Sequence, residues 1–238
     1  MTDRFDKHYW DDHWQQAASR GDAHVLGPNP YLADETVGLV PRSALDAGCG
    51  EGAEALWLAA QGWAVTAADI ASEALARARD RARGSAACDR VVWVEADLST
   101  WDPERRYDLV TTHYAHPAMP QLAFYARLSR WVAPGGTRLV VGHLHSPSAA
   151  AHGHEHGHGQ RQESAPAEAS ATAAGITALL DAAEWDVVTA VEQERTVGDR
   201  DRGRDGRAAT LHDVVVRATR QGGSSTGRPG SSSSIGSR

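Results

Sequence analysis

Three glycines alternate across a short turn that follows an apolar run, in the stretch LDAGCGEGA. They are Gly48, Gly50 and Gly52, and Asp46 lies two residues before the first of them. Such glycines let a ligand approach bare backbone, and Gly48-x-Gly50-x-x-Ala53 formally matches a dinucleotide fingerprint. A pyrophosphate at this turn would be repelled by Asp46 and by the neighbouring Glu51, however. The charge therefore favours a ligand with a cationic centre and no phosphate.

A second acid, Asp69, closes the next apolar run, GWAVTAAD. An acid about 20 residues after a glycine turn is placed to accept hydrogen bonds from a ribose. S-adenosylmethionine carries a sulfonium, an ammonium and a ribose, so it suits both the glycine turn and the two acids. Each acid also has a structural alternative, because Asp46 could cap a helix and Asp69 could be a strand-end turn residue.

Histidines and a tyrosine gather at the ends of two expected strands, in TTHYAHP and VGHLHSP. They are His113, Tyr114, His116, His143 and His145. Imidazole titrates near neutral pH and can remove a proton from a phenol, amine or thiol. The structural alternative for each is a histidine that caps carbonyls or forms a polar rim.

The elements that position these residues alternate along the chain. Short strands are expected at 43–48, 63–69, 90–97, 107–114 and 137–144. Helices are expected at 51–62, 71–84 and 118–136, the last broken by Pro134 and Gly135. Strands joined by helical crossovers predict a parallel sheet with helices on both faces.

The flanking segments differ in character. Residues 1–42 are expected to form a helical lid, with Asn29 as N-cap and Pro30 at the first helical position. After a helix at 172–183, the runs 184–197 and 208–220 are expected to pair antiparallel at one sheet edge. The structured domain is predicted to span 43–220, followed by a disordered tail at 221–238.

A flexible His-rich loop is expected at 146–170, where HGHEHGHG alternates four histidines with other residues. They are His152, His154, His156 and His158. Imidazoles bind zinc, copper and nickel, but glycine-spaced histidines do not preorganise a site. We therefore predict no functional metal here, and expect the loop to cover the acceptor pocket.

A family resemblance extends beyond the glycine turn. LDAGCGEGAEALWLA followed by GWAVTAADIASEALARAR resembles motifs I and II of the class I S-adenosylmethionine-dependent methyltransferases. The sequence of these motifs is similar to that of the small-molecule branch, which includes tellurite-resistance and thiopurine methyltransferases. The resemblance continues through VEADLSTW, YDLVTTHY and VAPGGTRLVVG, and covers roughly residues 28–145 and 175–219. It implies an α/β, Rossmann-like three-layer sandwich. Its mostly parallel seven-stranded sheet has the order 3-2-1-4-5-7-6 and an antiparallel terminal strand.

The resemblance also implies roles for individual residues. The three glycines would line the methionine portion of S-adenosylmethionine, with Asp46 near its ammonium and Asp69 at its ribose. Asp97 would meet the adenine amino group, with Leu98 supplying backbone, although ADLSTW also fits a capped turn. The remaining expected cofactor contacts are Cys49, Ile70 and His113, and Cys49 fits a small packing residue better than a nucleophile.

Methyl transfer from a sulfonium is an in-line displacement that needs alignment, exclusion of water and, for some acceptors, a base. The predicted catalytic residues are His113, Tyr114, His116 and His143, with His113 the first choice because it follows the fourth strand. A thiol acceptor needs little basic help, so alignment alone would then carry the reaction.

The composition limits the classes of partner that we expect for this protein. A net charge of −7 and a pI near 5.9 argue against nucleic acid, and the sequence has no apolar run near 18 residues that would span a membrane. Two cysteines, Cys49 and Cys88, fit a reducing cytoplasm. We expect a monomer or homodimer that methylates a heteroatom of a small molecule. A nicotinamide-dependent oxidoreductase and a non-catalytic cofactor- or metal-binding protein are the alternatives.

Overall fold

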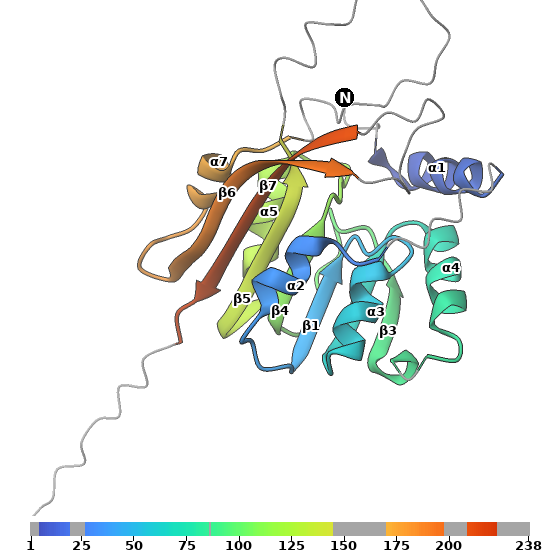
Figure 1. Ribbon diagram of the computed structural model, residues 1–238, viewed down its shortest axis with the longest axis horizontal. Coiled ribbons are helices and arrows are strands. Elements are labelled where there is room, and N and C mark those ends of the chain that lie inside the picture. The colour runs from blue at the N-terminus through green and yellow to red at the C-terminus, as the bar shows by residue number, and fades with distance from the viewer. Residues whose placement is uncertain (1–4, 20–26, 86, 145–169, 198–208, 223–238) are drawn as a thin grey trace, which may run out of the picture.

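The computed structural model describes residues 5–19, 27–85, 87–144, 170–197 and 209–222 (Figure 1). The expected His-rich loop, apart from Ser170, lies outside these ranges, as do its four alternating histidines and His145. Almost all of the expected tail also lies outside them. Within the described ranges, no helix has the length and apolar character of a membrane span.

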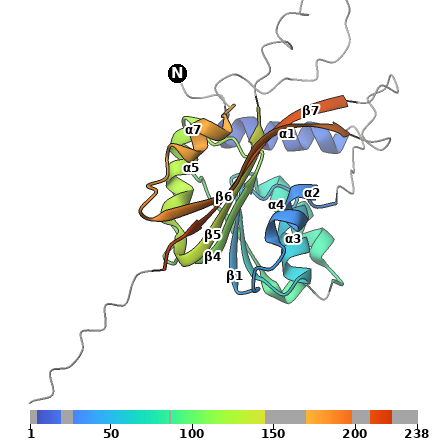
Figure 2. The same cartoon turned by 60° about the vertical axis from the view of Figure 1, so that its left-hand side comes forward.

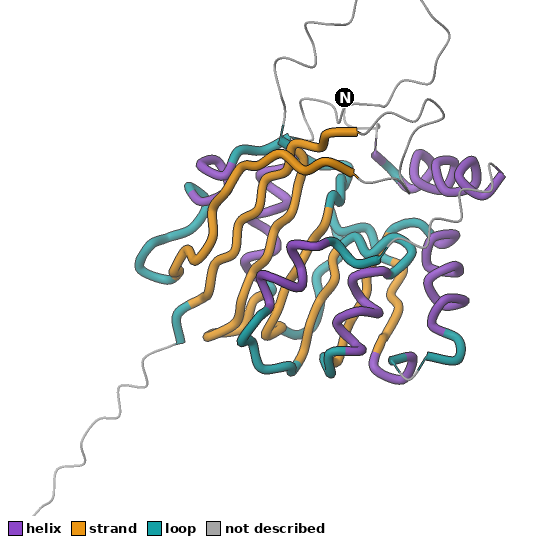
Figure 3. The backbone as a smooth tube through the Cα atoms, viewed as in Figure 1, coloured by secondary structure: helices purple, strands orange, loops and turns teal. Residues whose placement is uncertain are grey.

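A seven-stranded sheet forms the centre of the described structure (Figures 1 and 3). Its strands are β1 (Ser43–Ala47), β2 (Ala64–Asp69), β3 (Val91–Glu95), β4 (Tyr107–His113), β5 (Val132–His143), β6 (Trp185–Val197) and β7 (Ala209–Arg220). The strand order is β3-β2-β1-β4-β5-β7-β6, and β7 runs antiparallel to both of its neighbours. The predicted order and the antiparallel pair at the edge are confirmed.

Helices cover both faces of this sheet, which makes three layers (Figure 2). The helices are α1 (Lys7–Ser19), α2 (Pro30–Thr36), α3 (Ala53–Ala60), α4 (Ser72–Ala82), α5 (Gln121–Arg130) and α7 (Ala173–Thr177), with a 3-10 helix η2 (Cys88–Arg90). Leu32 of α2, Leu58 of α3 and Leu75 of α4 belong to one buried cluster. Phe124 of α5 and Ile176 of α7 belong to the cluster on the other face. The expected three-layer sandwich is therefore present.

Local signals place several helix ends. The Asn29 side chain accepts a hydrogen bond from the Tyr31 N–H and Pro30 is the first residue of α2, as predicted. Two glycines with positive φ follow α3 and α4, at Gly62 and Gly84. These caps let short helices end cleanly before each strand.

Two boundaries differ from the prediction. The expected helix at 118–136 ends at Arg130, and β5 starts at Val132, which pairs with Tyr107. The next paired position is Thr137 opposite Leu109, so the residues between, Pro134 and Gly135 among them, form an irregularity inside the strand rather than a helix end. The helix expected at 172–183 ends at Thr177.

The carboxyl ends of the parallel strands meet at the upper edge of the sheet in Figure 1, and α1 lies above this edge. The Lys7 Nζ donates to the carbonyl of Ile70, just after β2, at 3.1 Å. The Trp10 Nε1 donates to the carbonyl of His116, after β4, at 3.2 Å. The first helix therefore spans the edge where the candidate residues lie.

Candidate active site

The glycine turn joins β1 to α3 in a left-handed backbone conformation. Gly48, Gly50 and Gly52 have φ of +82°, +50° and +77°. The Gly48 N–H donates to the Ala68 carbonyl at 2.8 Å, which fixes the turn to the end of β2. All three positions favour glycine because side chains rarely adopt such φ values.

Neighbouring protein atoms fill the space beside two of these glycines. A Cβ on Gly48 would lie 2.3 Å from the Cβ of Ala115, and one on Gly52 would lie 2.5 Å from the Cη2 of Trp93. A Cβ on Gly50 would meet only Trp14 of α1, at 3.3 Å. Packing therefore requires glycine at Gly48 and Gly52. Gly50 is the position of the three at which a ligand could best approach the backbone closely.

Asp69 ties the glycine turn to the end of β2. Its Oδ2 accepts from the Gly50 N–H at 2.8 Å and its Oδ1 accepts from the Ala71 N–H at 2.9 Å. Burial raises the pKa of Asp69 although these hydrogen bonds oppose it. Each carboxylate oxygen keeps a second acceptor site, so the acid retains capacity for ribose hydroxyls.

Asp46 is fully buried on the face of β1 that is covered by α3. Its carboxylate accepts a hydrogen bond from the Ala55 N–H near the start of α3, so the capping role is present. Its Oδ2 has no hydrogen-bond partner among the described residues. Burial, and then Glu54 and Asp69, raise the pKa of Asp46 well above its ordinary value. A buried oxygen without a partner is a position where a ligand cation would be favoured.

His113 is on the same face of the sheet as Asp46, and its ring is buried. Asp46 pairs with Thr111 across β1 and β4, and Thr111 and His113 share one face of β4 because side chains alternate. Both ring nitrogens of His113 and the Thr111 Oγ1 are buried without a partner among the described residues. Burial lowers the pKa of His113, while Glu54 opposes this. The ring is therefore a neutral group beside the expected cofactor site, and its role as base stays a prediction.

The other expected cofactor residues line the same edge. Asp97 forms the capped turn that was its structural alternative, since its Oδ1 accepts from the Ser99 N–H at 2.8 Å. Leu98 is buried, and the Ile70 carbonyl is occupied by Lys7. Burial and nearby acids raise the pKa of Cys49 well above its ordinary value, which agrees with a packing thiol.

Three aromatic rings form a stack at the ends of β4 and β5. The Tyr114 and His143 ring centroids are 4.5 Å apart, and those of His143 and His116 are 5.6 Å apart. Tyr114 has a φ of +54°, the one positive value for a residue other than glycine in the described chain. Such strain is retained where surrounding contacts hold it, and it points to a functional position.

The stack is uncharged near neutral pH. Burial, and then His116 and Arg195, lower the pKa of His143 to about 4 despite the opposing effect of Asp213, and burial lowers that of His116. Burial, and then Asp213, raise the pKa of Tyr114 above its ordinary value. Neutral imidazoles can accept a proton, whereas a protonated phenol can donate a hydrogen bond.

Sequence reasoning missed four residues of this region: Tyr31, Gln121, Arg195 and Asp213. The Gln121 side chain bridges the His116 ring, at 3.2 Å, and the Ala115 carbonyl, at 2.9 Å. Asp213 is fully buried in the apolar run LHDVVV, and a lone acid in such a run was the available signal. Tyr31 and Arg195 carried no comparable local signal.

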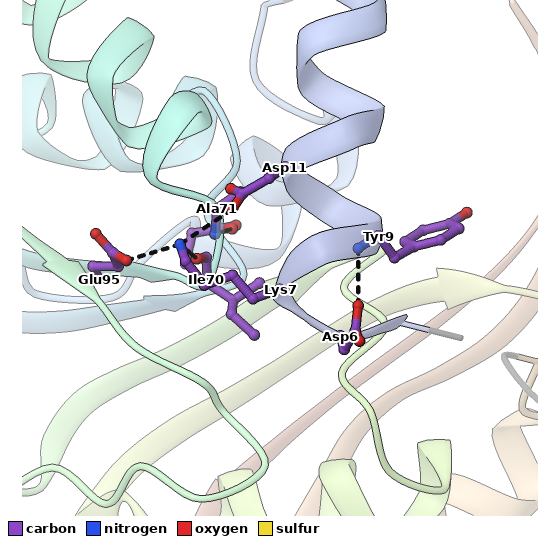
Figure 4. A network of polar contacts seen from close by, with 8 residues as sticks. Asp6, Lys7, Tyr9, Asp11, Ile70, Ala71 and Glu95 are labelled. Atoms are coloured by element: carbon purple, nitrogen blue, oxygen red, sulfur yellow. Dashed lines mark hydrogen bonds and ion pairs between the residues drawn. The ribbon is translucent and has the colours of Figure 1, made fainter. Parts of the chain in front are cut away.

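Helix α1 is held over the edge by polar contacts (Figure 4). Besides the Ile70 carbonyl, the Lys7 Nζ contacts Glu95 at 2.9 Å and Asp11 at 3.4 Å. At the other end of α1, the Trp14 carbonyl accepts from Arg77 of α4 at 2.7 Å. Among the described residues, no group of three or more His, Cys, Asp or Glu side chains is arranged to hold a metal ion.

Comparison with known proteins gives matches to methyltransferases. Residues 44–136 match a family model described as a methyltransferase domain. An uncharacterized methyltransferase of Mycobacterium tuberculosis is 36% identical over 112 residues, which are 46% of this chain and 55% of that relative. The trans-aconitate 2-methyltransferase of Streptomyces avermitilis is 34% identical over 116 residues, 45% of this chain and 42% of that relative. The chain thus spans about half the length of the curated relatives it matches.

A solved structure shares the fold over nearly the whole chain. N-methyltransferase NodS from Bradyrhizobium japonicum WM9, in complex with S-adenosyl-L-homocysteine, has a TM-score of 0.60 and 16% identity. The match covers 89% of this chain and 97% of NodS. Residues 44–136 therefore match a methyltransferase domain, and the likeness to NodS together with the strand order shows that this chain shares the NodS fold.

Proposed function

We propose that the protein transfers a methyl group from S-adenosylmethionine to a heteroatom of a small molecule. The observation that carries this proposal is the buried Asp46 carboxylate, whose Oδ2 has no partner in the described structure, beside a left-handed glycine turn. Burial disfavours the charged form of this carboxyl, and an ammonium group beside its free oxygen would stabilise that form. A pyrophosphate would add to the negative charge of Asp46, Glu54 and Asp69, which argues against a dinucleotide.

The chain's residues fit the parts of this cofactor. Asp46 would hold the ammonium, Asp69 would accept hydrogen bonds from the ribose, and Gly50 would give its backbone room. Asp97 and Leu98 would meet the adenine, and Cys49, Ile70 and His113 would complete the surroundings. When bound, the cofactor supplies a methyl group on a positively charged sulfur, which is already activated for displacement.

Proton removal falls to the ring stack. His143 and His116 are neutral and lie near the ends of β5 and β4, so either has a ring nitrogen for the proton of an acceptor hydroxyl or amine. The burial that lowers the pKa of both rings also makes each a weaker base than free imidazole. His113 is the further candidate, and its position on the face that carries Asp46 suits the cofactor side better. Tyr114 keeps its proton and positions the stack through its hydrogen bond to Asp213.

Exclusion of water falls to residues 1–42, which we propose act as a lid on the domain 43–220. Trp14 lies against Gly50 and Trp10 against the residues after β4, so α1 covers both halves of the edge. A small acceptor suits such a covered site. The acidic charge of the chain also argues against nucleic acid, and the named relatives include a methyltransferase for trans-aconitate.

Calorimetric titration tests the cofactor assignment. The purified chain is expected to bind S-adenosylmethionine and not NAD. Asp69→Asn should weaken that binding by about ten- to a hundredfold, the loss expected for a charge-assisted hydrogen bond. Asp80→Asn is the control, because the Asp80 side chain is 64% exposed and contacts Arg83. Binding of NAD alone would instead support the oxidoreductase.

A turnover assay tests catalysis. S-adenosyl-L-homocysteine release is measured with phenol, amine, thiol and carboxylate acceptors in turn. Release that depends on one acceptor class supports the proposal and identifies the class. Cofactor binding without release across all classes would support the non-catalytic alternative.

A further inference from the structure

A buried carboxylate gathers three donors beside the ring stack. Asp213 of β7 is fully buried. Its Oδ1 accepts from the Tyr114 hydroxyl at 2.9 Å, and its Oδ2 accepts from the Tyr31 hydroxyl at 3.1 Å. The Arg195 Nε donates to the same Oδ2 at 3.0 Å. The Asp213 carboxylate therefore pairs with the Arg195 guanidinium and accepts two further hydrogen bonds from neutral hydroxyls.

Arg195 is held rigidly but uses only part of its donor capacity. Its Nη2 donates to the Tyr114 hydroxyl at 3.2 Å, and its guanidinium lies 6.0 Å from the centre of the Tyr31 ring. A guanidinium has five N–H groups, and the described residues take two of them. The side chain is 26% exposed, so the other donors have access to the outside.

The arginine lies at the edge where the acceptor is expected. Tyr114 links it to the stack, since the Tyr114 hydroxyl accepts from Arg195 while its ring packs on His143. Arg138 provides a contrast, because it is fully buried under α5 and its hydrogen bonds within the described residues go to the Tyr125 carbonyl and the Ser129 hydroxyl. Of these two arginines, only Arg195 combines fixed geometry with access to the site.

We propose that Arg195 binds a carboxylate group of the methyl acceptor, whose flat portion lies against the stack of Tyr114, His143 and His116. The identification of this ligand as the acceptor rests on the proposed function. The planar fork of a guanidinium matches the two oxygens of a carboxylate, and Asp213 holds the fork in place before the ligand arrives. The ring stack offers the surface on which a conjugated or aromatic acid packs. The substrate class is therefore a small, flat carboxylic acid.

Calorimetry with benzoate and benzamide as probes tests this site, with and without S-adenosyl-L-homocysteine. Wild type is expected to bind benzoate more tightly than benzamide. Arg195→Gln should weaken benzoate binding about ten- to a hundredfold and leave benzamide binding within about twofold. Arg195→Lys keeps the charge and loses the planar fork, so its affinity for benzoate should lie between those of wild type and Arg195→Gln.

Arg220→Gln is the matched control. Arg220 also pairs with a carboxylate, lies 5.9 Å from an aromatic ring centre and has a 21% exposed side chain, but it is at the opposite end of β7. Because Arg220 is remote from Asp213 along β7, Arg220→Gln should leave the affinity for benzoate unchanged. Thermal unfolding of each variant checks the fold, and if Arg195→Gln does not fold, the comparison of Arg195→Lys with wild type decides.

The outcomes separate this site from the proposed function. Equal benzoate affinity in wild type and Arg195→Gln, or no preference for benzoate over benzamide, overturns the carboxylate site. If S-adenosyl-L-homocysteine binds in that case, the proposed function stands without it. If benzoate binding depends on Arg195 while S-adenosyl-L-homocysteine does not bind, the anion site stands and the methyltransferase function fails.

Discussion

The two halves of the carboxyl edge are built in different ways. In the half where we propose that the cofactor binds, called the cofactor half, Gly50 and Asp69 are 19 residues apart, and backbone N–H groups make the contacts. In the half where we propose that the acceptor binds, called the acceptor half, the partners of Asp213 are drawn from α2, the end of β4 and β6, and Tyr31 is 182 residues away. The first half is a local loop, whereas the second is a convergence of side chains from distant elements.

This difference has a physical consequence. A backbone loop tolerates changes in most of its side chains but is sensitive to any atom that displaces the main chain. A side-chain network around one buried charge depends on that charge, because each donor would otherwise be buried without a partner. The two halves should therefore fail under different substitutions.

The largest effect is expected at the centre of the acceptor half. Asp213→Ala leaves Arg195, Tyr31 and Tyr114 without their acceptor and should lower the free energy of unfolding by about 3–5 kcal/mol. Urea denaturation measures it. Asp186→Ala, on the exposed face of β6, should change stability by less than about 0.5 kcal/mol. A loss at Asp213 no larger than this control would mean that the network does not hold the half together.

The next effect is expected in the cofactor half. Gly48 and Gly38 have nearly equal φ of +82° and +79°, but only a Cβ on Gly48 meets atoms within 4 Å. Alanine at each should cost about 1–2 kcal/mol for the left-handed backbone. Gly48→Ala should cost about 1–3 kcal/mol more because of the clash with Ala115. Of the two variants, only Gly48→Ala should have a lower affinity for the cofactor. Equal stability and affinity in the two variants would contradict the packing role.

A smaller effect on stability, which depends on pH, is expected at the ring stack in the acceptor half. The folded pKa of His143, about 4, lies below the value near 6.5 of an unfolded histidine. The unfolded state therefore takes up a proton first, and stability falls as the pH drops from about 6.5 to about 4. His143→Phe keeps a ring and removes this term. The stability of wild type relative to the variant should drop by at most about 1.4 kcal/mol per pH unit in that window. A pH-independent difference would show that His143 is not desolvated.

The smallest effect is expected at the lid that joins the two halves. Lys7→Met removes contacts to Glu95, Asp11 and the Ile70 carbonyl, but the Lys7 side chain is 47% exposed. Exposed ion pairs contribute about 0–1 kcal/mol and weaken with salt. Urea denaturation at low and high salt measures this change. A decrease of several kcal/mol in the free energy of unfolding that did not depend on salt would instead indicate that α1 is a core element.

Most of the fold could be predicted from local features of the sequence, and so could a candidate cofactor site at the glycine turn. Alternating apolar runs with glycine ends located the strands, because burial and turn chemistry are local properties. The strand order required the family resemblance as well. Asp46 and Asp69 could be predicted as cofactor contacts because of their positions in the sequence relative to the glycine turn, and these roles stay predictions. The break at Gly135 was misread as a helix stop, since glycine also serves in strand irregularities.

The other features became visible once the positions of distant elements were known. The tertiary structure placed His113 on the buried face that carries Asp46 and showed that Ala115 and Trp93 fill the space next to Gly48 and Gly52. It also brought Arg195 to Asp213. No pattern in the sequence marks such contacts, because they depend on how elements far apart in the chain pack. Local periodicity sets which face a side chain occupies, and packing alone sets what that face meets.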